Sequence, residues 1–190
     1  MLQKEIDVLK ADITEAFRHT NYPGDDKLLH PSGNDDSDII SFYGQTSWQG
    51  VPDRIIEYEN AALSCFSPEA FQFFLPRFMI HALEHYDSEE IVTDHTIYAL
   101  SPEPDETPWP DIDDALLSAE EKELIAEIRE ESEKYSKDDD LTEYSVSMYS
   151  KLTEQQKRVI GKFLEFVQEN LIEYFDEREV GSAIRFWKRM

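Results

Sequence analysis

The stretch FSPEAFQFFLPRFMIHALEH, residues 66–85, constrains the fold more than any other part of the chain. Nine of its twenty residues are large and apolar or aromatic, and they fall on every side of a helix. A helix that is apolar all round is usually buried at the centre of a domain. Ser67, Pro68 and Glu69 supply a cap, a proline at the first helical position and an acid in the first turn, so we expect a helix to begin there.

Pro76 lies about two turns into this helix. A proline inside a helix removes one backbone hydrogen bond and clashes with the carbonyl four residues earlier. The sequence therefore predicts either one kinked helix or two abutting helices, over residues 68–75 and 76–86. The phenylalanines around Pro76 could line a pocket, but large aromatic residues most often pack in cores. We interpret the segment as the central helix against which the others pack.

Helical patterns also dominate the rest of the chain. Apolar residues recur every three or four positions or follow a helix-capping pattern in further segments, namely residues 2–17, 53–62, 88–98 and the runs that begin at SAEE (118–121) and TEQQ (153–156). We therefore predict an all-α, single compact helical domain over residues 1–190, with one small β-hairpin near residues 38–44 (DIISFYG) as the exception. Residues 101–117, rich in proline, and the polar residues 136–152 are predicted to be mobile loops.

The acidic charge is concentrated in the middle of the chain. The formal net charge is -24, and residues 84–143, with 22 acidic and 4 basic residues, carry -18 of it. Such a charge disfavours direct binding to nucleic-acid phosphates or to an anionic membrane and favours a basic protein partner, for example a toxin or a nucleic-acid enzyme. A solvated helix face is the plainer interpretation of the same residues. The predicted partner-binding residues are Glu120, Glu123, Glu127, Glu130, Glu131, Asp138, Asp139 and Asp140.

The composition and the sequence motifs indicate a compartment and the kinds of chemistry that the chain lacks signals for. A single cysteine, Cys65, excludes an internal disulfide, and there is no signal-like leader and no apolar run near the length of a membrane span. We therefore expect a cytoplasmic protein. No glycine-rich phosphate loop, nucleophile elbow or kinase motif occurs, so the sequence predicts no catalytic residue and no cofactor.

Two histidines close the central segment. His81 and His85 are four residues apart and would share one face of a helix, where Asp94 and His95 could approach them as further metal ligands. The plainer interpretation places His81 at the edge of the core and His85 at the helix C-terminus, where the helix dipole favours an imidazolium. We favour this second interpretation and predict no metal site.

Three functional hypotheses follow. The first is a non-enzymatic protein-binding module of the immunity or inhibitor type, which presents its acidic segment to a basic partner. The second is an oligomeric scaffold in which the C-terminal IRFWKRM docks on the acidic segment of another copy. The third is a metal-dependent hydrolase that uses His81, His85 and Asp94. An enzyme is the least favoured of these.

Several quoted segments resemble a family of uncharacterised bacterial proteins with the core motif F-[ST]-P-E-A-F followed by L-P. The matching positions are Pro52, Phe66 to Phe71, Leu75, Pro76, Leu100, Pro102 and Leu152 to Phe166. The resemblance covers about half of the chain, and its motifs are structural. It implies a bacterial helical protein of a domain family of unknown function, and it implies no activity.

Overall fold

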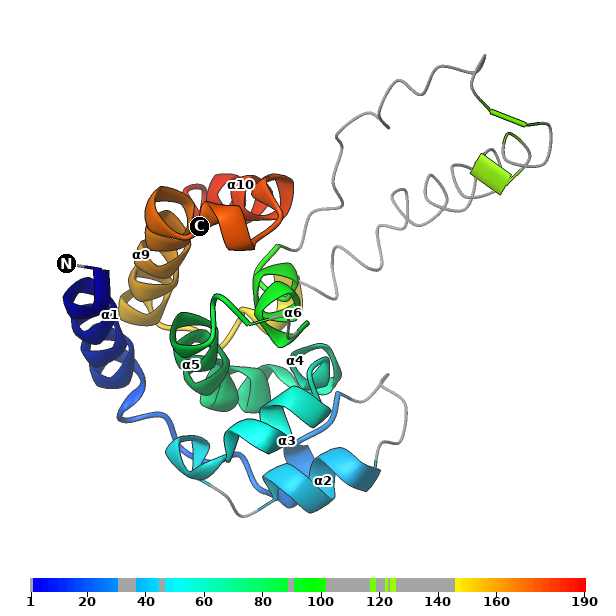
Figure 1. Cartoon of the computed structure of the whole chain (residues 1–190). Helices are drawn as coiled ribbons and strands as arrows, with labels where there is room; N and C mark the ends of the chain where they lie inside the picture. Colours follow the sequence, from blue (N-terminus) through cyan, green and yellow to red (C-terminus); the bar gives the residue numbers. More distant parts are fainter. Residues whose placement is uncertain are drawn as a thin grey trace.

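The computed structural model describes residues 2–30, 37–44, 47–88, 91–101 and 146–190, together with a few single positions between residues 117 and 125. Within these ranges the chain is mostly helical, which confirms the all-α prediction (Figure 1). The α-helices are α1 (Leu2–Phe17), α2 (Ser37–Tyr43), α3 (Asp53–Tyr58), α4 (Ala62–Cys65), α5 (Pro68–Glu84), α6 (Val92–Tyr98), α9 (Glu154–Asn170) and α10 (Glu177–Trp187). The short 3-10 helices are η1 (Asp25–Lys27), η2 (Trp48–Gly50) and η4 (Ile172–Tyr174).

Helix α5 lies at the centre of the core, as predicted. It packs against α1, α4, α6 and η2, and Phe71, Phe74 and Phe78 on it are at most 1% exposed. The Ser67 hydroxyl caps its first turn by accepting a hydrogen bond from the Ala70 backbone N–H at 3.1 Å. The aromatic side chains are therefore core residues, and full burial of one such ring stabilises the fold by about 1.5–3 kcal/mol.

Helices α1, α9 and α10 complete the core beside α5 (Figure 1). The predicted stripe of α1 comprises Leu2, Ile6, Leu9, Ile13 and Phe17, of which the last four are buried and Leu2 is partly buried against the core. The predicted capping box opens α9: the Thr153 hydroxyl accepts from the Gln156 N–H at 3.3 Å, and the Gln156 side chain accepts from the Thr153 N–H at 2.9 Å. These local signals were sufficient because each agrees with the face that the helix buries.

The predicted β-hairpin near residues 38–44 is wrong, because residues 37–43 form helix α2. Ile39 and Tyr43, four residues apart, are the buried residues of this segment, at 1% and 0% exposure. Ser41, which an alternating strand would place on the same face as Ile39 and Tyr43, is exposed. Helical spacing thus puts both large side chains into the core, and packing overrides the β-propensity of the two isoleucines.

Helix α5 continues through Pro76, so the alternative of two abutting helices is wrong. Pro76 is buried with its neighbours Phe74 and Phe78, whose rings both pack against Tyr43. This packing on both sides of the proline holds the two halves in one helix. The shorter helices cover less of the chain than predicted: α3 ends earlier, at Tyr58, and α6 begins later, at Val92.

Part of the predicted loop over residues 136–152 belongs to the core. Met148, Tyr149 and Leu152 are at most 6% exposed, and the Tyr149 hydroxyl donates to the Ala99 carbonyl at 2.7 Å. The spaced apolar side chains of residues 146–152 stand among serines in the sequence, which concealed their place in the core. Residues 136–145 of that loop and residues 102–116 of the other lie outside the described residues.

The C-terminal helix α10 packs against α6 and α9 of its own chain. Phe186 and Trp187 are at most 8% exposed, and the Trp187 indole N–H donates to the Leu100 carbonyl at 2.8 Å. Ile184, Phe186 and Trp187 of IRFWKRM are therefore buried within the chain, while its remaining residues, Arg185, Lys188, Arg189 and Met190, are exposed. Among the described helices, none combines the length and the apolar character that crossing a membrane requires.

Candidate metal centre

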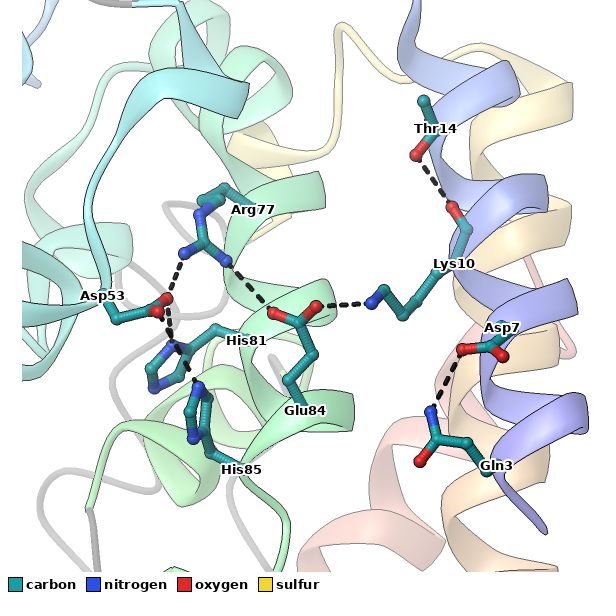
Figure 2. Close-up of polar contacts among 9 residues, drawn as sticks. All are labelled: Gln3, Asp7, Lys10, Thr14, Asp53, Arg77, His81, Glu84 and His85. Carbon is teal, nitrogen blue, oxygen red and sulfur yellow. Dashed lines mark hydrogen bonds and ion pairs between the residues drawn. The ribbon is translucent and has the colours of Figure 1, made fainter.

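One face of α5 carries a polar stripe that the aromatic face does not share. Arg77, His81 and His85 follow one another at intervals of four residues, so their side chains lie along the same side of the helix. Asp53, the first residue of α3, faces this stripe (Figure 2). Pro52 precedes Asp53 in extended conformation, with φ -68 and ψ 148, and so directs the start of α3 toward α5.

The Asp53 carboxylate faces both histidines. Its Oδ1 is 3.2 Å from His81 Nδ1, and its Oδ2 is 3.9 Å from His85 Nε2. The two imidazole rings lie side by side, with centroids 4.4 Å apart. One potential ligand atom from each of the three residues lies within 4.8 Å of the others. We call Asp53, His81 and His85 the Asp53 cluster.

Arg77 links the cluster to the rest of the core. Its Nε donates to the Val51 carbonyl at 3.0 Å, and its Nη2 donates to Oδ1 of Asp53. Its Nη1 is 3.8 Å from Oε2 of Glu84, whose Oε1 accepts from Lys10 on α1. A continuous row of alternating charges thus runs from α3 through α5 to α1 (Figure 2).

The members of the cluster differ in exposure. The side chain of His81 is 0% exposed, whereas those of His85 and Asp53 are 38% and 46% exposed. The cluster therefore has one buried end and one end open to solvent. His81 Nε2 is buried without a hydrogen-bond partner in the described part of the chain, so Asp53 provides the hydrogen bond of this ring. A buried, half-satisfied imidazole lowers stability, and such groups in native proteins call for a functional explanation.

The electrostatics prepare both groups to act as ligands. Burial lowers the pKa of His81, as does the neighbouring His85, and these effects outweigh the hydrogen bond to Asp53. Burial tends to raise the pKa of Asp53, but hydrogen bonds from His81 and Arg77 outweigh it and lower the pKa. At neutral pH Asp53 is therefore ionised and His81 neutral, which are the forms in which carboxylate and imidazole bind metals.

The donor set fits a divalent transition metal. Two imidazoles and one carboxylate suit Zn²⁺ or Fe²⁺, whereas Ca²⁺ and Mg²⁺ prefer oxygen ligands alone. Bonds of about 2.1 Å to a tetrahedral ion place ligand atoms about 3.4 Å apart. The observed separations of 3.2 and 3.9 Å fall on either side of that value. Arg77 is the feature that opposes a metal, because its positive charge already contacts Asp53.

The fold brings together only two of the three ligands that the sequence suggested for a metal site, His81, His85 and Asp94. His81 and His85 are adjacent, but the carboxylate beside them belongs to Asp53 and not to Asp94. Asp94 lies on α6, where partial desolvation and the nearby Asp176 raise its pKa and His95 lowers it. The prediction of Asp94 as a ligand therefore has no support in the described geometry. The eight predicted partner-binding acids, Glu120 to Asp140, lie outside the described residues.

Sequence reasoning missed Asp53 because its distance in the sequence from His81, 28 residues, carries no spacing signal. Arg77 was accessible from the sequence, since it precedes His81 by one helical turn on the same face.

Comparison with known proteins places the chain in a family. Residues 9–111 match the family of unknown function DUF6714, and the chain belongs to this family. This range includes α3 and α5 and thus the whole Asp53 cluster. It leaves out α9 and α10. No curated protein and no solved structure shows a significant match to the chain.

Proposed function

We propose that this chain is a metal-binding protein that holds one divalent transition-metal ion through Asp53, His81 and His85. The observation that carries the proposal is the convergence of three donor groups within 4.8 Å of one another. The partial exposure of Asp53 and His85 supports it, because an ion would enter the cluster directly from solvent.

The chemistry of such a site is hydrolytic. An ion with three protein ligands keeps a fourth position for water and, in the case of Zn²⁺, lowers the pKa of that water to about 7. Asp53 and His85 are partly exposed, so a substrate would reach the site from their side.

Zn²⁺ titration of the chelator-stripped, full-length chain by isothermal calorimetry tests the proposal. We expect one ion per chain. Asp53→Asn and His85→Ala should each weaken binding by more than the tenfold to hundredfold typical of losing an outer partner, since each removes a direct ligand. Asp94→Asn is the matched control and should bind like the wild type. Absence of binding by the wild type, or equal binding by all four proteins, would contradict the proposal.

Binding should also stabilise the fold. An ion present at one hundred times its dissociation constant adds about 2.7 kcal/mol to the free energy of unfolding. A rise in Tm with Zn²⁺ that is absent in His85→Ala would place the binding at this cluster, because His85 is partly exposed and its loss leaves the core intact.

A second proposal rests on charge. The -18 of residues 84–143 is far more than solubility requires, and a basic protein that uses it would associate rapidly and in a salt-dependent way. We propose Glu127, Glu130 and Glu131 as the residues to test. Reversing these three charges should weaken binding to a purified basic partner at low salt and flatten its salt dependence. Binding that is indifferent to both changes would exclude this role.

A further inference from the structure

Arg77 sits between two carboxylates that it can reach with different nitrogens. Nη2 contacts Asp53, and Nη1 is 3.8 Å from Glu84. The guanidinium is held at its base, because Nε donates to the Val51 carbonyl at 3.0 Å. Its side chain is only 11% exposed, and in the described part of the chain its ion pairs are with Asp53 and Glu84. The head group can therefore turn from one acid to the other about a fixed anchor.

A metal ion and the Arg77 guanidinium cannot both use Oδ1 of Asp53 without repelling each other. The same oxygen contacts Arg77 and lies 3.2 Å from His81 Nδ1, so the position of an ion between them borders the guanidinium. Like charges at such a distance in a partly buried place interact strongly. Binding of the ion thus favours movement of Arg77 away from Asp53.

Glu84 is the acceptor available to Arg77. Its Oε1 is engaged by Lys10 of α1, while Oε2 is the oxygen that faces Arg77. A shift of Nη1 from 3.8 Å to hydrogen-bond distance would complete this pair. Lys10 holds the same carboxylate and so competes with Arg77 for it.

We propose, on the basis of the metal-binding function above, that Arg77 is an internal competitor of the metal ion and passes from Asp53 to Glu84 when the ion binds. Arg77 is thereby a specificity-determining residue. An ion must bind Asp53 more strongly than the guanidinium does. The imidazoles of His81 and His85 add enough affinity for Zn²⁺, Ni²⁺ or Cu²⁺, but not for Mg²⁺ or Ca²⁺, which prefer oxygen ligands. Through Glu84, the affinity of the site is also coupled to Lys10 on α1.

Calorimetric Zn²⁺ titration of variants tests this exchange. Arg77→Met should tighten binding about tenfold, because Asp53 loses its competitor. Lys10→Met frees Glu84 to receive Arg77 and should tighten binding about threefold, while Glu84→Gln removes the acceptor and should weaken it about threefold. A purely structural role of this ion-pair row would weaken binding in all three variants.

A double-mutant cycle separates the exchange from the general effect of charge on a cation. If Glu84 acts through Arg77, Glu84→Gln should change affinity about threefold in the wild type and hardly at all in Arg77→Met. The same change in both backgrounds would overturn the proposal. Arg77→Gln, which keeps a donor for the Val51 carbonyl, replaces Arg77→Met if that variant does not fold.

The closing measurement distinguishes the two proposals. If the wild-type chain binds no Zn²⁺, the proposed metal-binding function itself is wrong. If the wild-type chain binds Zn²⁺, but neither Lys10→Met nor Arg77→Met changes the affinity, only the proposed exchange of Arg77 is wrong. Binding of Mg²⁺ as tight as that of Zn²⁺ would overturn the specificity assigned to Arg77.

Discussion

Gln156 and His81 are both buried polar side chains at contacts between helices, with 3% and 0% exposure. They differ in how many hydrogen bonds their polar atoms make. The Gln156 amide oxygen accepts from Gln72 at 2.8 Å and from the Thr153 N–H at 2.9 Å, and its Nε2 donates to Thr20 at 3.0 Å. In contrast, His81 has one hydrogen bond, to Asp53, and its Nε2 has no partner in the described chain.

The difference separates a structural polar group from a functional one. A fully paired buried network specifies how helices pack, and Gln156 joins the start of α9 to α5 and to the segment that follows α1. The Asp53 cluster instead brings three potential metal ligands together and exposes two of them to solvent, which packing alone does not require. We therefore assign the first network to stability and the second to binding.

The largest expected effect is the loss of Gln156. Gln156→Ala removes a capping box and two contacts between helices and should lower the free energy of unfolding by about 2–3 kcal/mol. Urea unfolding measures this loss. Gln155→Ala, on the exposed side of the same turn, is the control and should stay within about 0.5 kcal/mol of the wild type. Equal losses in the two variants would remove the distinction drawn here.

Arg77→Met should have the next largest effect, and it should act in opposite directions on stability and on binding. The variant leaves the buried Val51 carbonyl without its donor and Asp53 without its ion pair, so unfolding should become easier by about 1–2 kcal/mol. Lys10→Met breaks a more exposed pair and should lose less than about 1 kcal/mol. Chemical denaturation of metal-free protein provides both values, and a larger loss in Lys10→Met would contradict the assignment.

The sequence predicts those elements whose local signals agree with their packing. The α1 stripe, the Ser67 cap and the Thr153 capping box are all visible as short patterns, and the structure confirms each. The segment over residues 38–44 could not be assigned correctly, because its isoleucines favour a strand. Its helix is stabilised by packing against α5, as in the contact between Tyr43 and Phe74. Tertiary packing that overrides local preference is invisible in a single sequence.

The sequence predicts only the two histidines of the candidate site, for a related reason. His81 and His85 share a helix, so their proximity follows from a spacing of four residues. Asp53 comes from another helix, and its approach depends on how α3 packs against α5. Among 42 acidic residues, no pattern marks the one that this packing selects.

A pair of tyrosines tests how the fold responds to an unpaired hydroxyl. The hydroxyl of Tyr43 is buried without a partner in the described chain, while that of Tyr149 donates to Ala99 at 2.7 Å. Tyr43→Phe should therefore leave stability unchanged or raise it by up to about 1 kcal/mol, whereas Tyr149→Phe should lower it by about 1 kcal/mol. Thermal unfolding of both variants decides. A clear loss of stability in Tyr43→Phe would show that its hydroxyl is paired after all.

The smallest expected effect is the pH dependence of Asp94→Asn, which tests the carboxylate that lies outside the Asp53 cluster. Partial desolvation and the nearby Asp176 raise the pKa of Asp94 in the folded chain above its usual 3.8. The folded state thus binds the proton more tightly than the unfolded state, so stability from this group is present at low pH and is lost as pH rises through the raised pKa. Asp94→Asn removes the charge and should have a slightly higher Tm than the wild type at neutral pH.

This gain should disappear below pH 3.8, where Asp94 is protonated in both states. Tm measured across this pH range checks the sign, and an advantage of the wild type at neutral pH would contradict it. Because Asp94 is exposed and the difference is small, the same variant remains a suitable control for metal binding. A decrease in Zn²⁺ affinity in Asp94→Asn would move the ligand set back toward α6 and away from Asp53.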